Sequence, residues 1–295
     1  MALNKAAHAV EHCAVDSESL NALGSAVGRQ VLIRRSSTRL ALYTVAEPVS
    51  GAARAVHAGT AGLTRLGTAT DDPFNATLET DFTQGNPQAP VRLTEEVLGN
   101  VGAGLAILAP HGGRIEEGTD DQARAVYDAL AQKAKPVRAW IAQGFNPATG
   151  AHPCWHITSS EISERSFPKL RSLFGFTGSR GPFAHAVAFH GQNDSDAIVV
   201  GGGLPRSTAD TAVKTALASQ IEEALGAVTS DPPAVEVGLR GPLAGAERRN
   251  IVNRVTVGGN GLQLEQPLAV RKNKEQRQAV ARAVAEFFEA RLTGT

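Results

Sequence analysis

The sequence predicts an α/β fold: a mixed, mostly parallel sheet with helices on both faces, together with a small β-rich N-terminal region. From about residue 92 onward, short apolar runs alternate with longer amphipathic segments, the order expected of strands joined by crossover helices. The run Ala103–Ala109 contains no polar residue, which is typical of a strand buried on both faces. Aromatic residues make up 5% of the chain whereas 30 residues are glycine, a composition that suits helices packed closely on a sheet.

The N-terminal third follows a different pattern. Residues 28–90 contain two short alternating runs, GRQVLIRR and TRLALYTVAE, and then a stretch rich in turn-forming residues, so we expect short strands there. Residues 1–26 have only a weak helical periodicity and predict a loosely docked arm. At roughly 150 residues per domain, we expect residues 1–95 to form an arm and a small β-rich region of unknown role, and residues 96–295 to form a larger domain.

The larger domain begins with the strand at Ala103–Ala109 and ends with a helix. Thr119 is expected to cap the first helix, with Gln122 at the capping-box position, and Asn273 to cap the last one. Between these two helices the pattern predicts strands at Val137–Gln143, His152–Thr158, Ala184–Phe189, Ala197–Val200, Ala234–Gly238 and Gly261–Glu265, a short helix from Pro168, and a helix from Ser207 or Thr208 to Gly226.

Charge and composition argue against several classes of protein. Lys+Arg and Asp+Glu both number 29, and the resulting net charge of zero argues against a dedicated nucleic-acid binder. No apolar run reaches the roughly 18–20 residues that span a bilayer, so no membrane partner is expected. Glu11 and Asp16 lie where a signal peptide would be apolar, and two cysteines fit a reducing compartment. We therefore expect a cytoplasmic protein, which would reach an external substrate by lysis or by a route that the N-terminus does not show.

The first buried strand is followed by residues that can bind a metal. It ends in PHGGRIEEG (110–118), where two glycines allow a tight turn that brings the His111 and Glu116 side chains together. Histidine nitrogen and glutamate oxygen are both good zinc ligands. The alternative is a glycine-rich turn with an exposed histidine and a glutamate that interacts with a helix dipole.

A second histidine, His190, follows the strand Ala184–Phe189 in the same kind of position. Ligands gather at the carboxyl ends of strands in α/β sheets. Two histidines and one glutamate would complete a catalytic zinc set that leaves one coordination position open. The alternative for His190 is a structural role.

Two further segments offer groups for catalysis and substrate binding. The strand GLQLE ends in Glu265, which could act as a general base on an activated water or simply pair with Arg271 or Lys272. The segment Arg248–Arg254 offers arginine and asparagine donors that suit a carboxylate, or forms a solvated basic loop. Between Arg240 and Lys274 there are seven basic and two acidic residues, a local balance of +5 that favours a polyanionic substrate.

Two other motifs have less support as sites. On a strand, His152, Cys154 and His156 would share one face, but no further cysteine lies near to complete a four-ligand metal site. The hydroxyl-rich residues that follow suit a substrate pocket better. Gly201–Gly203 lacks the spacing of a nucleotide-binding loop, and the chain contains no G-x-S-x-G motif of a serine hydrolase.

Taken together, these segments resemble the poly-γ-glutamate hydrolases, a family of zinc enzymes of bacteriophages and bacteria with a carboxypeptidase-like fold. The matching segments cover roughly residues 100–290, in the family's order: APHGGRIEEGT (109–119), HITSS (156–160), AFHG (188–191), VVGGG (199–203), NIVNR (250–254) and GLQLE (261–265). The chain departs from the family at Arg114, which stands where glycine is common, and residues 1–95 have no counterpart in the compact phage enzymes.

The resemblance implies roles for seven residues. The zinc ligands would be His111, Glu116 and His190, the catalytic residue Glu265, and the substrate-binding residues His156, Asn253 and Arg254. Residues 96–295 would then form the zinc hydrolase domain. The implied activity is cleavage of γ-glutamyl amide bonds in poly-γ-glutamate or a related γ-glutamyl substrate. Two alternatives remain: a zinc deacylase or peptidase acting on other amides, and a non-catalytic binding or structural module.

Overall fold

The computed structural model describes residues 9–49, 54–68, 73–99, 104–174, 181–203 and 208–292. The chain forms two compact units. Unit 1 comprises Met1–Thr94 and Gly144–Pro168, and unit 2 comprises Glu95–Gln143 and Lys169–Thr295. A segment from the middle of the sequence therefore packs with the N-terminal region.

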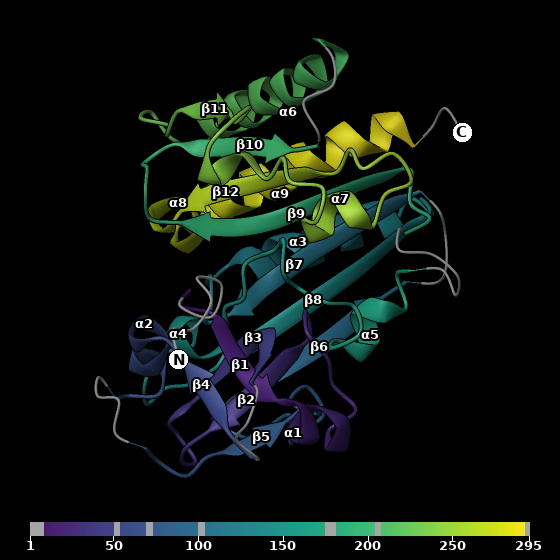
Figure 1. Ribbon diagram of the computed structural model, residues 1–295. Helices are drawn as coiled ribbons and strands as arrows, with labels where there is room; N and C mark the ends of the chain where they lie inside the picture. Colours follow the sequence, from purple (N-terminus) through teal and green to yellow (C-terminus); the bar gives the residue numbers. More distant parts are fainter. Residues whose placement is uncertain are drawn as a thin grey trace. The chain divides into compact units, whose positions relative to one another are not determined.

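Unit 1 is built on a five-stranded sheet with the order β4-β1-β3-β2-β5. Its strands are β1 (His12–Asp16), β2 (Gln30–Arg34), β3 (Leu40–Val49), β4 (Val56–Ala58) and β5 (Thr77–Glu79). β3 is parallel to β1 and antiparallel to β2, and β4 is antiparallel to β1. The β-rich region expected over residues 28–90 is present (Figure 1).

The expected loose arm is wrong for residues 12–16, because β1 lies inside this sheet between β3 and β4. Cys13 and Val15 of β1 are fully buried and join the core of unit 1. That core also contains Val31, Ile33, Ala41, Tyr43, Val45 and Leu66. Three short helices belong to unit 1: α1 (Ser17–Ala22), α2 (Thr60–Arg65) and α4 (His152–Trp155).

Unit 2 contains most of a seven-stranded sheet with the order β11-β10-β12-β9-β7-β8-β6. The strands are β6 (Arg92–Leu98), β7 (Leu105–Gly113), β8 (Val137–Phe145), β9 (His185–Gln192), β10 (Ile198–Gly202), β11 (Val235–Val237) and β12 (Leu262–Pro267). β9 is parallel to both β7 and β12, β10 is parallel to β11, and β10 is antiparallel to β12. The predicted mixed α/β fold is confirmed.

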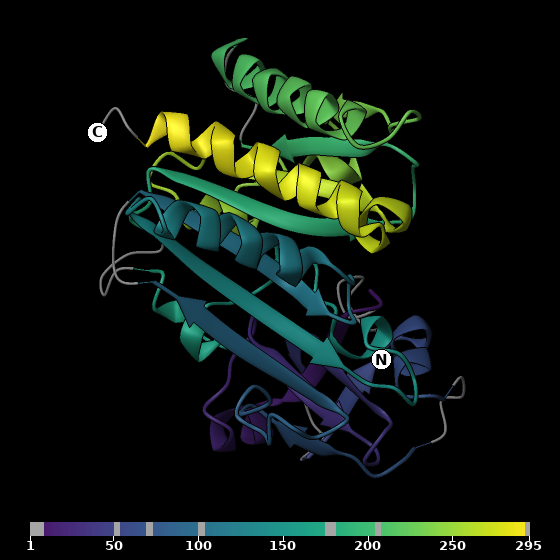
Figure 2. The ribbon, with the colours of Figure 1, turned by 180° about the vertical axis from the view of Figure 1, so that it is seen from behind.

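Three long helices cover one face of the larger sheet, as Figure 2 shows. They are α3 (Thr119–Ala131), α6 (Thr208–Gly226) and α9 (Lys274–Arg291), and their apolar residues pack with those of the strands into one core. Short α7 (Ile251–Arg254) packs against β9 and β12 from the other face. The other short helical segments of the described residues are α5 (Pro168–Arg171), α8 (Leu268–Lys272) and a 3₁₀ turn at Pro242–Ala244. The Asn273 cap is confirmed, since its side chain accepts from Gln276 N.

Two local predictions are wrong, and one lies outside the described residues. Gly118, not Thr119, is the N-cap of α3, and the Thr119 hydroxyl instead donates to Glu116 O. The segment expected as a strand at His152–Thr158 begins with helix α4, because His156 N donates to His152 O and the chain turns. Of the two caps expected for α6, Ser207 lies outside the described residues.

The glycine run Gly201–Gly203 has a packing role. Gly202 has a φ of +91°, and a Cβ there would lie 2.2 Å from the backbone oxygen of Gly261, the residue just before β12. Such a φ is strained for any residue with a Cβ, and the neighbouring backbone cannot move aside cheaply. Gly202 therefore allows β10 and β12 to approach each other.

We expect Gly202→Ala to lower the free energy of unfolding by at least about 3 kcal/mol, since backbone strain and overlap add. Denaturant unfolding monitored by circular dichroism measures this change. Gly226→Ala is the matched control, because a Cβ at Gly226 meets nothing within 4 Å. Equal stability of the two variants would contradict this account of the glycine run.

Glu11, just before β1, has a largely buried carboxylate, 15% exposed, with several partners. Burial raises the pKa of Glu11. This effect is outweighed by the hydrogen bond to His156, by the charges of His156 and Arg65, and by the hydrogen bond from Thr158 N. Together they lower the pKa from 4.5 to about 2. Because the folded-state pKa is depressed, the carboxylate stabilises the fold above about pH 4.5 and loses this contribution as the pH falls toward 2.

We therefore expect Glu11→Gln to destabilise the protein near neutral pH by an amount on the order of 3 kcal/mol. The difference from wild type should shrink as the pH falls from 4.5 to 2. Urea unfolding at several pH values measures it, with the exposed Glu18→Gln as control. A stability difference that stays constant down to pH 2 would contradict the assigned pKa.

Among the described residues, no helix has the length and apolarity needed to cross a membrane.

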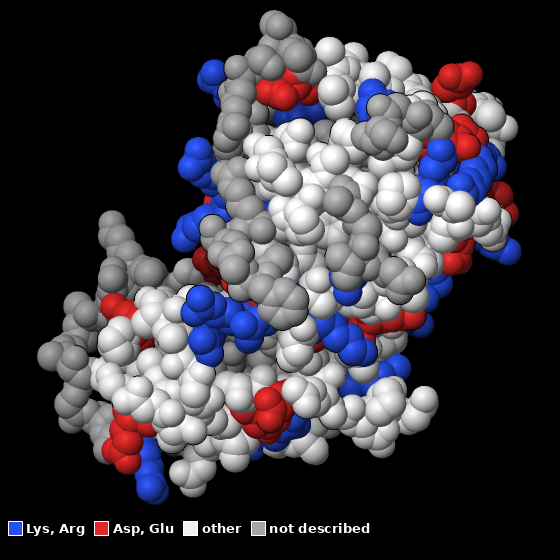
Figure 3. All heavy atoms as spheres, turned by 90° about the vertical axis from the view of Figure 1, so that its right-hand side faces the viewer, with Lys and Arg blue, Asp and Glu red and all other residues white. Residues whose placement is uncertain are grey.

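Acidic and basic side chains both occur across the face drawn in Figure 3. The basic stretch from Arg240 to Lys274 is not uniformly available to a ligand, because Arg271 within it is buried.

Candidate metal centre

The carboxyl ends of two neighbouring strands bring two histidines together. β7 and β9 are parallel, with Leu105 opposite His185 and Leu108 opposite Ala188. His111 and His190 therefore lie near the same edge of the sheet, where parallel strands end. Both are buried, with 3% of each residue exposed. Burial argues against the alternative of an exposed histidine in a glycine-rich turn.

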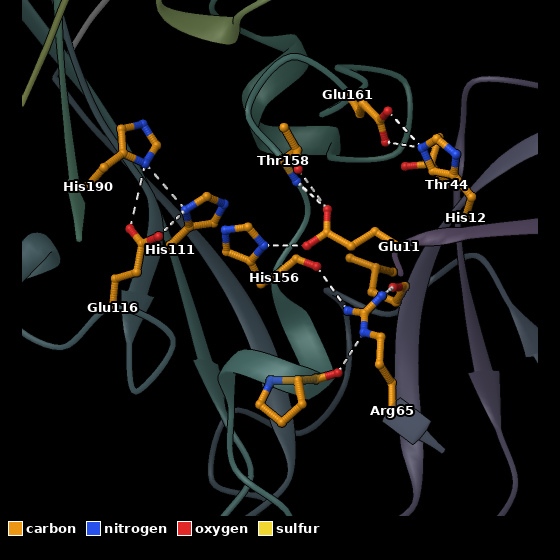
Figure 4. Close-up of polar contacts among 12 residues, drawn as sticks. Glu11, His12, Thr44, Arg65, His111, Glu116, His156, Thr158, Glu161 and His190 are labelled. Atoms are coloured by element: carbon orange, nitrogen blue, oxygen red, sulfur yellow. Dashed lines mark hydrogen bonds and ion pairs between the residues drawn. The ribbon is translucent and has the colours of Figure 1, made fainter. Parts of the chain in front are cut away.

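Glu116 completes a cluster with these two histidines, and Figure 4 shows the three side chains turned toward one another. Nδ1 of His111 lies 3.0 Å from Glu116 Oε1 and 3.3 Å from Nδ1 of His190. Nδ1 of His190 lies 3.5 Å from Glu116 Oε2. Within the described part of the chain, these three residues form the group able to hold a metal ion.

These distances fit a bound cation. Ligand atoms about 2.0–2.2 Å from a tetrahedral metal ion lie about 3.3 Å from one another, and the three measured separations of 3.0, 3.3 and 3.5 Å bracket that value. Two neutral imidazole nitrogens that face each other at 3.3 Å repel unless a proton or a cation lies between them. The donor set, two nitrogens and one carboxylate, leaves a tetrahedral metal ion with an open position.

The backbone around the cluster holds Glu116 in place. Gly191 N donates to Glu116 Oε2 at 2.8 Å, and Glu116 N donates to His111 O at 2.7 Å, which closes the turn after β7. A Cβ at Gly191 would lie 2.3 Å from the guanidinium carbon of Arg271. Glycine after His190 therefore makes room for that arginine.

Arg271 is a buried cation beside the cluster. It is not part of the site predicted from the sequence. Its guanidinium donates to Gln266 O and Glu117 O. Burial lowers the pKa of Arg271, and the charges of nearby carboxylates, Glu116 and Glu265 among them, oppose this effect. The sequence offered one sign of a buried arginine, namely its place after an apolar stretch. An arginine at such a position can equally form an ion pair on the surface.

Glu265 lies next to His190 across parallel strands, because the two residues are register partners in β12 and β9. Side chains of such partners point to the same face of a sheet. Gln263 Nε2 donates to Glu265 Oε1 at 2.8 Å, and Gln263 Oε1 accepts from Asn250 Nδ2 at 2.8 Å. This chain of hydrogen bonds orients the Glu265 carboxylate. The orienting role of Gln263 and Asn250 could not be predicted from the sequence, since an amide two residues from a carboxylate has no distinctive pattern.

Asn253 and Arg254 lie on α7, in the same unit. Both amide hydrogens of Asn253 are donated, to Gly245 O and Glu247 O, and its Oδ1 accepts from Gly203 N. Asn253 therefore organises the loops before and beside α7. A direct hydrogen bond from Asn253 to a substrate would replace one of these three hydrogen bonds. Arg254 is partly exposed, and its guanidinium lies 5.3 Å from the centre of the Phe174 ring.

His156 belongs to unit 1, where its Nδ1 is hydrogen bonded to Glu11. Its ring stacks on that of His152, with 4.4 Å between the ring centres. Cys154 does not share a strand face with these histidines. It is 1% exposed, and burial raises the pKa of its thiol to about 12, which disfavours the thiolate that binds metals.

Arg114, the residue that departs from the family pattern, lies on the surface. Its side chain is 64% exposed and donates to Glu117 Oε1 at 2.7 Å.

A family model described as poly-gamma-glutamate hydrolase matches residues 94–289. Solved structures with a similar fold include a bacteriophage poly-gamma-glutamate hydrolase, 24% identical with a TM-score of 0.51, with the match covering 70% of this chain and 92% of that one. A zinc-free YndL structure is 21% identical with a TM-score of 0.47 and coverage of 66% and 89%. A metallo-carboxypeptidase from Burkholderia cenocepacia is 13% identical with a TM-score of 0.41 and coverage of 90% and 80%. A comparison with curated proteins finds no match.

Proposed function

The chain belongs to the poly-γ-glutamate hydrolase family, and we propose that it cleaves the γ-glutamyl amide bonds of poly-γ-glutamate with a zinc ion held by His111, Glu116 and His190. The family match shows that the chain is a hydrolase. The observation that supports the metal-dependent chemistry is the buried cluster of three ligand atoms with separations of 3.0–3.5 Å.

Zinc suits this donor set better than other common ions. Two imidazoles and one carboxylate form a ligand set of catalytic zinc sites, whereas Mg²⁺ and Ca²⁺ prefer oxygen ligands alone. When bound, zinc would supply Lewis acidity to the scissile carbonyl and to the attacking water.

The protein's own groups would move the proton and hold the substrate. Glu265, oriented by Gln263, would accept a proton from the attacking water and deliver it to the leaving amine. The Arg254 guanidinium would bind an α-carboxylate, of which each γ-linked glutamate unit carries one. Asn253 would support Arg254 by fixing α7. His156, which belongs to unit 1, would be a further substrate-binding residue.

The test is incubation of the purified protein with poly-γ-glutamate, with product length measured by size-exclusion chromatography. We expect short oligomers, no cleavage after treatment with a chelator, and recovery on addition of zinc. α-Linked glutamyl peptides and N-acylamino acids serve as comparison substrates. Faster turnover of either would support the alternative peptidase or deacylase, and zinc binding without turnover of any amide would support a binding module.

A further inference from the structure

We propose that unit 2 contains a second binding site, a pocket that binds a carboxylate at the edge of the large sheet opposite the candidate metal centre. Its cationic donors are Lys214 of α6 and Arg291 of α9. The pocket has a volume of about 100 Å³, which admits a carboxylate on a short methylene chain. Neither the proposed metal ligands nor Glu265 line it, so the proposal does not depend on the hydrolase activity.

The pocket lies where three strands and two long helices begin or end. His185 is the first residue of β9 and Leu262 the first of β12, whereas Gly203 directly follows β10, which runs antiparallel to β12. Helix α6 begins at this edge and α9 ends there (Figure 1). His190 lies five residues further along β9, which is roughly 16 Å at 3.3 Å per residue. The pocket is therefore separate from the candidate metal centre.

Lys214 is a buried cation that lines this pocket. Only 2% of the residue is exposed, and burial lowers the pKa of its ammonium. The charge of Asp210, one turn earlier on α6, opposes this effect. Within the described part of the chain, no oxygen atom lies within hydrogen-bonding distance of the Lys214 ammonium. A buried cation without a partner is unfavourable, and an anion bound in the pocket would supply that partner.

Arg291, the last residue of α9, adds a second cation to the lining. Its guanidinium lies over the Phe287 ring, 3.5 Å from the ring centre, and Nη1 donates to Phe287 O at 3.1 Å. A guanidinium carries five N–H groups, and this is the one hydrogen bond that Arg291 makes with the described residues. Its other N–H groups can therefore donate to a bound anion.

The charges of the lining fit one monovalent anion. Lys214 and Arg291 contribute two positive charges and Asp210 contributes one negative charge. Burial and the charge of Arg291 lower the pKa of His185, so its imidazole is neutral near neutral pH. The pocket therefore carries a net charge of +1, which a single carboxylate would balance.

The uncharged part of the lining is largely apolar. Leu262 and Phe288 are 5% and 2% exposed, and the Phe288 ring contacts the His185 ring with 6.0 Å between the ring centres. A carboxylate on a methylene chain fits both kinds of wall, since its oxygens accept from the cations and its chain packs on the apolar side chains. A phosphate dianion would carry more charge than the pocket balances and would place an oxygen against the apolar wall. Free glutamate and each unit of a γ-linked glutamate chain carry the fitting group.

The test measures how strongly carboxylates stabilise the folded protein. Three probes are added at constant ionic strength: sodium glutamate, sodium phosphate, and N-acetylglutamate γ-methylamide, which mimics one internal unit of the polymer. Thermal unfolding is followed by circular dichroism, and mass spectrometry checks that the amide stays intact. Because a ligand that binds the folded state stabilises it in proportion to the logarithm of its concentration above Kd, the series gives Kd. We expect both carboxylates to bind more tightly than phosphate, and the tighter carboxylate identifies the source as free amino acid or polymer.

Lys214→Met removes the charge and keeps the length of the side chain. We expect it to weaken the binding of both carboxylates at least about tenfold, as for loss of a charge-assisted hydrogen bond. Without ligand, this variant should be at least as stable as wild type, because burial penalises the charge that it removes. Arg291→Met should weaken binding at least about threefold, and it also serves if Lys214→Met does not fold. Lys133→Met is the matched control and should bind as wild type does, because the Lys133 ammonium pairs with Glu289 elsewhere in unit 2.

Backbone amide shifts in the ¹H–¹⁵N NMR spectrum locate the bound glutamate. We expect the amides of residues 210–214 and 287–291 to shift in wild type and in Lys133→Met, and to stay unchanged in Lys214→Met. Any binding at the candidate metal centre is common to all these proteins. Equal Kd values for wild type and Lys214→Met, tighter binding of phosphate than of either carboxylate, or unchanged amides at this pocket in wild type would overturn the proposal. None of these readouts uses turnover, so a failure of wild type to cleave poly-γ-glutamate would contradict the proposed function alone.

Discussion

Glu116→Gln is expected to abolish metal binding and to lower kcat/KM on poly-γ-glutamate by about a thousandfold or more. The substitution keeps the size of the side chain but removes the negative charge that the two buried imidazoles need beside them to bind a cation. A metal ion stabilises the transition state by several kcal/mol, and losing that stabilisation lowers the rate by a factor of this size. Metal content by inductively coupled plasma mass spectrometry and steady-state kinetics measure the two effects.

Glu117→Gln is the matched control for this prediction. Glu117 is the next residue along the chain, but its side chain is 37% exposed and pairs with Arg114 on the surface. We expect metal content and activity near those of wild type. A Glu116→Gln protein that still binds one metal per chain, or that retains a tenth of wild-type activity, would contradict the assignment of Glu116 as a ligand.

Glu265→Gln is expected to lower kcat by roughly 10²–10⁴, the usual contribution of a general acid–base residue. Because Glu265 is outside the three-residue cluster, metal content should stay at the wild-type level. KM should change little, because a proton-transfer group acts mainly in the transition state. Rapid-quench kinetics on the metal-loaded variant separates the chemical step from substrate binding.

The control for Glu265→Gln is Glu236→Gln on the edge strand β11, an exposed carboxylate that strand β10 separates from β12. This variant should keep wild-type kcat. If Glu265→Gln lost its metal, Glu265 would be a ligand rather than a base. Activity within tenfold of wild type would assign the proton transfer to another group.

Of the candidate site, the cluster of His111, Glu116 and His190 could be predicted most fully from the sequence. His111 and Glu116 are five residues apart after an unbroken apolar run, and His190 follows another apolar run. The carboxyl ends of strands in an α/β sheet are where ligands gather, which is why these residues were expected to meet. The supporting groups were not accessible in this way. Gln263 and Asn250 act through hydrogen bonds between a strand and a loop, and Arg271 through burial, and neither property has a pattern in the sequence.

The N-terminal fold was harder to predict because its pairing is not local. β1 has five residues, too few for a periodicity, and it becomes a strand by pairing with β3, which lies more than twenty residues later. The prediction of a strand at HPCWHIT (152–158) was wrong for a local reason, since its alternation of polar and apolar residues is also typical of a strand. Helical hydrogen bonds, such as that from His156 N to His152 O, and the bond from Trp155 Nε1 to Phe145 O give it a turn instead.

The most direct test of the central claim is a zinc titration of the metal-free protein with turnover of poly-γ-glutamate as the readout. If His111, Glu116 and His190 hold one catalytic zinc ion, the rate should be negligible without metal, rise in proportion to added zinc, and reach a plateau at one equivalent per chain. Full activity of the metal-free protein, or a rate that does not respond to zinc, would contradict it.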